Sequence, residues 1–581
     1  MQKTASLLAT LFATPLLLAQ VPVIEQFGSG CGGYGGQEAT IDIFPPMRPG
    51  SWSTIQLDHL TPFAQAVLMI GDSRTQWGSV VLPASLAPVN MPGCSLLVSP
   101  LIQMPFFTTS PTVAAGFPVP EDPVLAASDL YFQAFFAEPG LNAPGIGLSK
   151  ALRNRVAPLP TPTSPVTSIT QFGITFQFAQ PVEAGQFVNG DWFVIGPVTL
   201  VDMQPACTTV GTRVIHGAMI NPNPSTYMQG YDRGLYGAGN ENRYSDTLNV
   251  AKNLAPGNPL VLAPNQSLVK IISNMNTAFI PQIDTCAVLT CLAVRPPLGS
   301  FRPPYAGNDH SVAYDVEMID WSALLSVTAS SGMPSMSAQV AKFERPWLDH
   351  APGWPARFMH PVQNMPDYGR DFTTLFNESA LMCNVNLPLQ QKQLLVTRLV
   401  QVGIDFWGNV KNGCSWEGTG GHDSGRKLPI LFAGALLHDV EMLAVGANYP
   451  SVRNLNGTYT AHFGEDCQTF VVQQTSATQV NWGYGGYTST DVGTPEFGFA
   501  HVHAPNADNS NWLGDSYRRC CTANAWIGGV LCARMMGLKQ AWSHDALFDY
   551  MDRYTQIETS GWTKSWSPWV ASMWDAHRAS F

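Results

Sequence analysis

Residues 416–437 read WEGTGGHDSGRKLPILFAGALL, a polar, glycine-rich segment that runs directly into a stretch that is apolar nearly all round. A helix that is apolar on every side has to be buried, so we expect residues 428–437 to form an inner helix of a larger helical body. A histidine, an aspartate, an arginine and a lysine precede this helix. Such groups cost desolvation free energy beside a core helix unless they are paired or used in chemistry. The segment therefore predicts a buried helix and a candidate site at its N-terminal end.

Helical patterns surround this segment from residue 301 to residue 581. Leu395, Leu399, Val402 and Phe406 follow one another on one helical face and predict an amphipathic helix. Further helices are expected over 336–348, 370–382 and 517–536, and after Ser543. An outer amphipathic helix followed by an inner apolar helix is the repeat unit of an α/α toroid. We therefore expect residues 301–581 to form an all-α, toroid-like catalytic domain, with an irregular helical bundle as the alternative.

The residues before position 301 are expected to form two all-β, sandwich-like modules. Short apolar runs of strand length, bounded by glycine and proline, fill residues 21–157 and residues 167–300. Between them, residues 158–166 read PLPTPTSPV, and this proline-rich composition predicts an extended linker. The sequence thus predicts a multidomain chain in which two β modules precede a helical domain.

The N-terminus has the features of an export signal. Residues 1–20 combine a basic start with an apolar run that is too short to span a bilayer comfortably, so we expect a signal peptide and a secreted protein, whether extracellular, periplasmic or on the cell surface. No later run of about 18 apolar residues predicts a membrane span. The net charge is −11, with no lysine or arginine cluster, which argues against a dedicated nucleic-acid binder.

Eleven cysteines in an exported chain favour disulfides. We expect Cys31 to bond with Cys94, because both lie in the first β module. Cys207 has two candidate partners in the second module, Cys286 and Cys291. The adjacent residues at positions 520 and 521 are expected to bond with different partners rather than with each other.

Three polar loops carry the candidate site residues, and each of them is expected to enter the N-terminal end of a helix. If these helices are inner helices of a toroid, their N-termini meet at one mouth, where helix dipoles favour an anion. The candidates are Trp416, His422, Arg426 and Lys427 in the first loop, His503, Tyr517 and Arg518 in the second, and His360, Asn364 and Tyr368 in the third. His501 and His503 alternate, which also suits metal binding, although two ligands alone are weak evidence.

A family resemblance follows from these loops. The motif Gly420-Gly421-His422-x-x-Gly425-Arg426-Lys427 is similar to loops of secreted, carbohydrate-active toroids. Together with β modules in an exported chain, it resembles the α/α-toroid polysaccharide lyases that act on uronic acids. The resemblance covers about half of the chain. Several of those lyases carry the β-sandwich after the helices, whereas here it comes first. The resemblance implies β-elimination on an anionic, uronic-acid-containing polysaccharide.

The chemistry of β-elimination assigns roles to the candidates. The uronate carboxylate has to be neutralised, a base has to remove the C5 proton, and an acid has to protonate the leaving oxygen. A tyrosine can do both proton transfers when nearby cations lower its pKa. We expect Tyr517, beside Arg518, to be this residue, and His422 to be a base or a neutralising group. Arg426 and Lys427 are expected to bind substrate carboxylates, and aromatic residues such as Trp416 to stack on sugar rings.

Two other functions compete with the lyase. A glycoside hydrolase needs two positioned carboxylates, and Glu417, Asp423 and Asp515 are available. A secreted carbohydrate-binding or surface protein would suit the β modules, but it would leave the polar loops unexplained. We expect no cofactor, while a structural or charge-neutralising divalent cation stays open as an alternative. The sequence predicts no oligomeric state.

Overall fold

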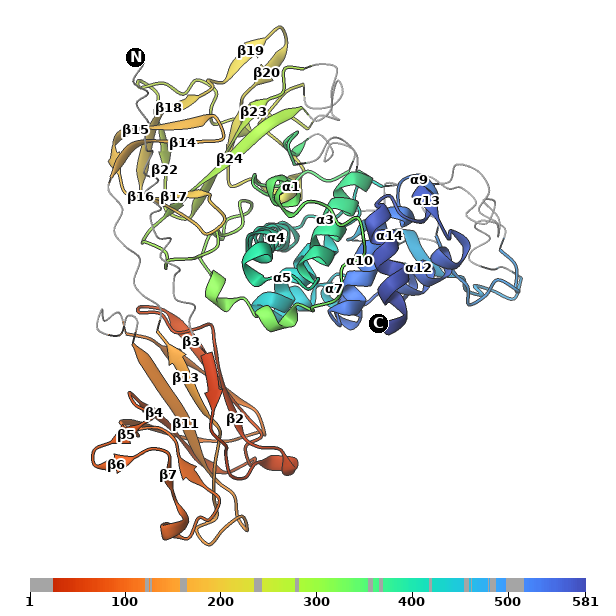
Figure 1. The fold of residues 1–581 in the computed structure, drawn as a ribbon. Coiled ribbons are helices and arrows are strands. Elements are labelled where there is room, and N and C mark those ends of the chain that lie inside the picture. Colours follow the sequence, from red (N-terminus) through yellow and green to blue (C-terminus); the bar gives the residue numbers. More distant parts are fainter. Residues whose placement is uncertain are drawn as a thin grey trace, which may run out of the picture. The chain divides into compact units, whose positions relative to one another are not determined.

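The computed structural model describes residues 24–120, 125, 128–156, 165–234, 243–276, 282–353, 359–364, 369–416, 421–453, 459–460, 462–478, 480, 487–497 and 517–581. The chain divides into two compact units between Leu159 and Pro160, inside the stretch expected to be the linker. Residues 1–20, the expected signal peptide, lie outside the described residues. The β-rich part of the chain precedes the helical part, as predicted (Figure 1).

The first unit is built mainly from two β-sheets, accompanied by two short strand pairs, β5 (Gln76–Trp77) with β6 (Val80–Val81) and β7 (Ala84–Ser85) with β8 (Ser95–Leu96) (Figure 1). The larger sheet has the order β1-β13-β11-β4-β9, with β12 paired to β11, and the smaller sheet has the order β10-β3-β2. The strands of the larger sheet are β1 (Ile24–Phe27), β4 (Gln65–Gly71), β9 (Ile102–Phe107), β11 (Asp129–Ala137), β12 (Ile146–Leu148) and β13 (Ala151–Arg155). Those of the smaller sheet are β2 (Thr40–Phe44), β3 (Trp52–Asp58) and β10 (Val113–Pro118). Alternate residues of both sheets, among them Ile55 and Phe132, share one buried core.

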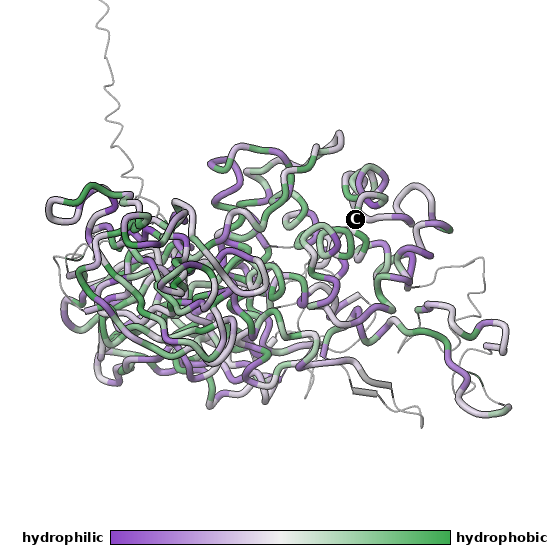
Figure 2. The backbone as a smooth tube through the Cα atoms, turned by 90° about the horizontal axis from the view of Figure 1, so that it is seen from below, coloured by the Kyte–Doolittle hydropathy of each residue, from purple (hydrophilic) through white to green (hydrophobic). Residues whose placement is uncertain are grey.

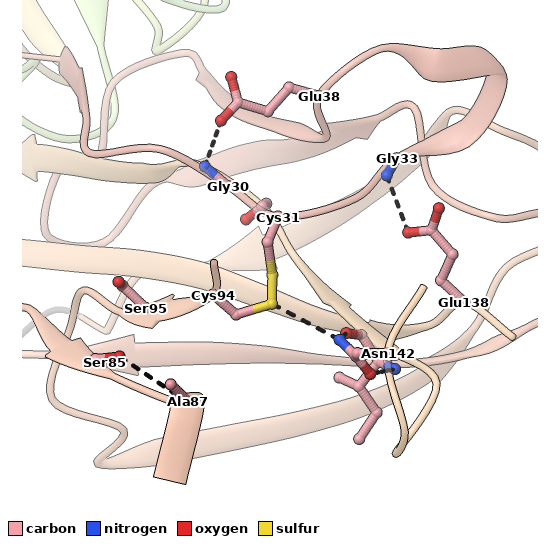
Figure 3. Close-up of a disulfide and its surroundings, with 12 residues drawn as sticks. Gly30, Cys31, Gly33, Glu38, Ser85, Ala87, Cys94, Ser95, Glu138 and Asn142 are labelled. Carbon is pink, nitrogen blue, oxygen red and sulfur yellow. Dashed lines mark hydrogen bonds between the residues drawn. A yellow bond between two sulfur atoms is a disulfide. The ribbon is translucent and has the colours of Figure 1, made fainter. Parts of the chain in front are cut away.

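A disulfide between Cys31 and Cys94 ties the N-terminal segment to the rest of this unit, as predicted (Figure 3). Hydrogen bonds support the chain around it. The backbone N–H of Gly33 donates to the carboxylate of Glu138 over 2.9 Å, and that of Gly30 donates to Glu38. The bond therefore sits in a locally ordered frame rather than in an isolated loop.

The second unit begins with another pair of β-sheets. One sheet has the order β14-β15-β18-β22, and the other has the order β16-β17-β24-β23-β21. The first comprises β14 (Val166–Gln171), β15 (Ile174–Val182), β18 (Val198–Gln204) and β22 (Leu260–Leu262). The second comprises β16 (Ala184–Gln186), β17 (Trp192–Ile195), β21 (Ala218–Ile220), β23 (Gln266–Ser273) and β24 (Ile283–Leu292). Residues from both sheets, such as Phe176 and Leu289, pack into a common core.

The five-stranded sheet is buried on both faces, which explains the nearly continuous apolar sequence of β24. One face belongs to the core of the β-sandwich. On the other face, Ile271 and Val288 pack with Tyr305 and Leu348 from the segment that leads into the helices. The β-sheets and helices of this unit therefore share apolar packing.

The helical part follows the sheets. Its longer helices are α1 (Met336–Lys342), α3 (Gly369–Cys383), α4 (Leu389–Lys411), α5 (Lys427–Leu437), α10 (Ala523–Met535), α12 (Asp545–Ile557) and α14 (Pro568–His577). The shorter ones are α6 (Val440–Leu443), α7 (Val445–Asn448), α8 (Gly464–Gln468), α9 (Tyr517–Cys520), α11 (Lys539–Trp542) and α13 (Gly561–Lys564). Strands β27 (Thr469–Val471) and β28 (Pro495–Phe497) form a small hairpin-like pair beside them. Helix α5 is almost entirely buried, as its apolar sequence predicts.

Helices α3 and α10 run parallel. The hydrogen bonds from Arg370 to the carbonyl of Cys520, from Asn377 to Ala525 and from Asn384 to Cys532 advance together along both segments. The C-terminal ends of α5 and α3 lie close together. Residues 320–325 hydrogen-bond both with Leu436, near the end of α5, and with Asn384, just after α3. The N-terminal ends of these three helices consequently lie on one side of the helical part.

Two expectations about this unit were wrong. Cys520 and Cys521 bond with each other, and this bond lies where the helix expected over 517–536 is interrupted between α9 and α10. Cys207, Cys286 and Cys291 are free thiols. Strand alternation places two of these thiols on opposite faces of β24. Cys286 faces the core shared with the helical part, whereas Cys291 faces the core of the sandwich.

Hydrophobic residues are interspersed with hydrophilic ones along the tube of Figure 2. Within the described part of the chain, no helix has both the length and the apolar character needed to cross a membrane.

Candidate functional site

The loop before α5 and the short helix α9 meet at the beginning of α3. A side chain at position 369 would lie 2.1 Å from the carbonyl oxygen of Gly421 and 2.3 Å from the Cα of His422, so only glycine allows this approach. The hydroxyl of Thr373 donates to the carbonyl of Ser424 over 3.0 Å. On another side, the guanidinium of Arg370 donates to the carbonyl of Cys520, the last residue of α9. The segments carrying His422 and Tyr517 therefore both adjoin the first turn of α3.

A small cavity lies beside the first turn of α3, next to the contacts just described. Its lining comes from α3, α5, α8, α10, α11, α12 and the loop before α5. The lining residues are Thr373, Asn377, Gly425, Leu428, Glu465, Trp526, Gly529, Val530, Trp542 and Leu547. Most of this lining is apolar, so the polar groups that reach the cavity stand out chemically.

Glu465 is the ionisable residue of that lining, and it is buried. Its Oε2 accepts a hydrogen bond from the backbone N–H of Gly425 over 3.0 Å, while its Oε1 has no hydrogen-bond partner among the residues that the structure describes. Burial, and next the charge of Asp466, raise the pKa of the Glu465 carboxyl to about 7. A carboxyl group of this kind can hold or release a proton near neutral pH.

Arg426 is buried and paired rather than open to a cleft. Its Nε lies 2.7 Å from Oδ2 of Asp349, and its guanidinium stacks 3.7 Å from the centre of the Phe372 ring. The same guanidinium donates to the carbonyl oxygens of His422 and Ser424 over 2.9 and 2.7 Å. Arg426 thus holds the loop in shape. The expectation that it faces a cleft and binds substrate does not agree with this burial, because the pair with Asp349 already satisfies its charge.

Lys427 and Arg518 are enclosed in the same way. The ammonium of Lys427 donates to Asp466 and to the carbonyl of Trp542, and the Trp542 indole also donates to Asp466. Arg518 is fully buried, with its guanidinium 3.3 Å from a carboxylate oxygen of Glu496. Sequence reasoning placed both cations beside substrate, but long-range packing supplies each with a carboxylate inside the protein.

Three further candidates contribute to the core. Trp416 is completely buried between the rings of Phe406 and Phe463, so it offers no face to a sugar. The expected stacking role is therefore wrong for Trp416, because its ring fills the helical core. His360 is buried against the ring of Trp347, and burial, reinforced by the charge of Arg426, lowers the pKa of His360 well below its usual value.

Asn364 is also buried, and it donates to the backbone carbonyls of residues 345 and 346. It therefore fixes the chain before α3. His422 is buried at the start of the loop, next to Gly369, and of the candidates in the first loop it is the one whose backbone lies directly on the beginning of α3.

Other candidates lie outside the described residues. These are Tyr368, His501 and His503, together with Glu417 and Asp515, which were considered for hydrolysis. Tyr517 is described only through its backbone, as the first residue of α9.

Sequence reasoning missed Glu465 and Asp349. Neither residue belongs to a glycine-rich loop or to a recognisable spacing, and each lies beside a second polar residue, Asp466 and His350 respectively. The one available signal was a carboxylate placed next to apolar sequence, which is common and unspecific. No group of three or more histidine, cysteine, aspartate or glutamate side chains in the described part of the chain could hold a metal ion.

Comparison with known proteins identified no relative. No protein-family model matches the chain, and no curated protein matches it either.

Proposed function

We propose that the protein is a secreted polysaccharide lyase that cleaves a uronic-acid-containing polysaccharide by β-elimination. The observation that carries the proposal is the meeting of the His422 loop and α9 at the N-terminal end of α3, where the helices α3, α5 and α10 begin on one side. Helix N-termini carry partial positive charge and favour an anion such as a uronate carboxylate. Residues 1–20, with their basic start and apolar run, support export.

In this proposal, the reaction is divided between two residues that approach α3 from different loops. A base removes the proton from C5 of the uronate, a double bond forms between C4 and C5, the C4–O bond breaks, and an acid protonates the departing oxygen. Tyr517 performs the proton transfers, and His422 either assists as a base or neutralises the carboxylate. Tyr368 and His503 bind the sugars.

The buried cations act as positioning residues in this scheme. Arg426 holds the carbonyls of His422 and Ser424, so it fixes the loop without touching substrate. Arg518 follows Tyr517 directly and is anchored by Glu496, which orients the beginning of α9. Such fixed supports keep reacting groups in their productive geometry.

One observation favours a second candidate, a glycoside hydrolase of the same architecture. The raised pKa of Glu465 keeps a share of this carboxyl protonated near pH 7, as a general acid requires. Asp423 lies close by, because a side chain at position 464 would lie 2.8 Å from the carbonyl carbon of Asp423. These two residues are the hydrolytic pair that we would test.

One assay separates the two reactions. The purified protein is incubated with alginate, glucuronan, pectate, heparinoids and ulvan, and both ultraviolet absorbance and new reducing ends are followed. The lyase produces an unsaturated uronate that absorbs, whereas the hydrolase produces reducing ends without that absorbance. Replacing Tyr517→Phe removes only the hydroxyl, and we expect kcat of the lyase to fall by about 10²–10⁴-fold.

Tyr34→Phe, at an exposed tyrosine of the first unit, is the matched control and should retain full activity. Undiminished turnover by the Tyr517→Phe variant would remove Tyr517 from the mechanism. Reducing ends without absorbance, lost in Glu465→Gln, would replace the lyase with the hydrolase.

A further inference from the structure

The outer face of the smaller sheet in the first unit carries an ordered row of side chains. Strand β3 buries Ser53, Ile55 and Leu57 in the core, so the alternate residues of this strand point away from it. The outward row consists of Trp52, Thr54, Gln56 and Asp58. Strands β2 and β3 are drawn in red in Figure 1.

Trp52 is exposed to 67%, a large value for a tryptophan, and its ring leans toward the neighbouring strand β10. Position 116 on the paired strand β10 is a glycine, and a Cβ there would lie 3.5 Å from Cε3 and Cζ3 of the Trp52 ring. The ring edge that carries these two carbons therefore lies next to position 116, at ordinary contact distance from where a Cβ would stand. Most of the side chain stays open to solvent.

Polar groups continue the row away from the ring. The amide of Gln56 donates to Oδ2 of Asp58 over 2.9 Å, and the hydroxyl of Thr112 donates to Oδ1 of the same carboxylate over 2.7 Å. On the β10 side, the residues opposite Thr54 and Gln56 are Gly116 and Ala114, which are too small to cover the row. From Trp52 to Asp58 the strand rises about 20 Å, the length of a short oligosaccharide.

We propose that this face is a second carbohydrate-binding site, and that it binds a neutral polysaccharide chain. The C–H face of one sugar stacks on the Trp52 ring, and the hydroxyls of the following sugars hydrogen-bond with Thr54, Gln56 and Asp58. An exposed aromatic residue on a rigid sheet loses little conformational entropy on binding. This suits the weak binding of a polymer built from repeating sugar units.

The charge of the face selects the ligand. Strands β2, β3 and β10 contribute Asp42 and Asp58 and contain no lysine or arginine. An anionic polyuronate would meet two carboxylates without a compensating cation, whereas a neutral glycan meets only hydrogen-bonding groups. The site therefore takes a different polymer from the one proposed for the helical part. It would attach the protein to a neutral matrix that accompanies its substrate.

Affinity gel electrophoresis of the full chain tests this proposal. The gels contain hydroxyethylcellulose or galactomannan as neutral probes, and polygalacturonate as the acidic probe. We expect at least one neutral polymer to retard the protein. Trp52→Ala should weaken this retardation at least about tenfold, because tryptophan is enriched among the few residues that carry most of a binding energy.

Two variants sharpen the result. Trp77→Ala removes another exposed tryptophan of the same unit, from strand β5 (Gln76–Trp77), and should leave the retardation unchanged. Gly116→Val keeps Trp52 but places branched methyl groups against the edge of its ring, which should displace the ring and weaken binding as Trp52→Ala does. Valine is favourable in a strand, so this second variant should fold.

Three results would overturn the proposal. The first is a lack of retardation by both neutral polymers, and the second is equal retardation of the Trp52→Ala and unchanged proteins. The third is retardation by polygalacturonate that disappears in Trp52→Ala, since this would place an acidic polymer on the face. The lyase assay does not involve this face, so failure here leaves the proposed reaction standing, and failure there leaves this site standing.

Discussion

The two units of this protein stabilise themselves with different chemistry. The first unit combines a disulfide and an apolar core with ion pairs at its surface. One such pair is Lys150 with Glu38, whose side chains are each about one-third exposed. In the helical part of the second unit, ion pairs such as Arg426 with Asp349 are almost completely buried. The difference teaches that a charge beside apolar sequence does not by itself indicate a substrate contact, because the interior can provide the partner.

Buried and exposed pairs should respond very differently to mutation. A surface pair contributes little because water and salt screen it. A buried pair leaves an uncompensated charge when one partner is removed, although the intact pair itself gives only weak net stabilisation. The experiments below test this contrast, beginning with the largest expected effect.

Removing Arg426 should have the largest effect on stability. In Arg426→Ala, the buried Asp349 carboxylate loses its partner, and we expect the second unit to lose about 3–5 kcal/mol of unfolding free energy. Denaturant titration of the full chain measures this loss. The control is Arg295→Ala, whose partner Glu183 is at the surface of the same unit, with an expected loss below about 1 kcal/mol. A loss of that small size in Arg426→Ala would show that the buried pair is not a structural support.

The disulfide should matter mainly to the first unit. Cys31 and Cys94 are 63 positions apart, and the loop that they close should contribute about 4 kcal/mol in the chain-entropy model. In the double variant with serine at both positions, calorimetry should show a lower Tm for the transition of the first unit and an unchanged transition for the second. Cys207→Ser, at a free thiol, is the control. Equal shifts of both transitions would contradict independent units.

Glu465 should make the stability of the helical part depend on pH. Its pKa of about 7 in the fold is higher than the usual value near 4.3 in an unfolded chain, so the fold favours the protonated form. The associated stability is present below pH 4.3 and is lost as the pH rises to 7. Glu465→Gln stays neutral, so relative to the unchanged protein it should gain on the order of 2–3 kcal/mol between pH 4.5 and 7.

Unfolding free energies of both proteins, measured at half-unit pH intervals, check this prediction. Asp545→Asn, at an exposed carboxylate near the same helices, should show no comparable trend. If the difference between the Glu465→Gln and unchanged proteins stays constant with pH, the carboxyl does not titrate in this range.

The smallest effect is expected at the surface of the first unit. Lys150→Ala removes the 3.1 Å pair with Glu38, and the loss should be below about 1 kcal/mol and should shrink further in high salt. Denaturant titration at low and high salt measures both quantities. A loss comparable with that of Arg426→Ala would abolish the distinction between buried and exposed ion pairs.

Only part of the candidate site could be predicted from the sequence. The structure brings the His422 loop and α9, two of the segments that the sequence singled out, to the same end of α3. The individual roles were harder to predict. Nothing near Arg426 in the sequence reveals Asp349, which lies 77 positions earlier, and nothing in the Glu465 segment indicates that it reaches the cavity.

The sequence by itself determined features that depend on local periodicity and composition. Alternating and continuous apolar runs identified β-rich residues before a helical part, and the apolar run after Lys427 identified helix α5. The position of two cysteines in one module was enough to pair Cys31 with Cys94. These features need only neighbours along the chain, or elements of one small module, to be in place.

The tertiary structure alone decided which groups became partners and which became buried. It paired Arg426 with Asp349, placed the Trp416 ring in the core, and joined Cys520 to Cys521. Burial and pairing depend on contacts between segments that are far apart in sequence, and the cost of an unpaired buried charge is paid only once those segments have packed. A linear pattern can therefore indicate where charges gather, but the packing of the helices determines what they contact.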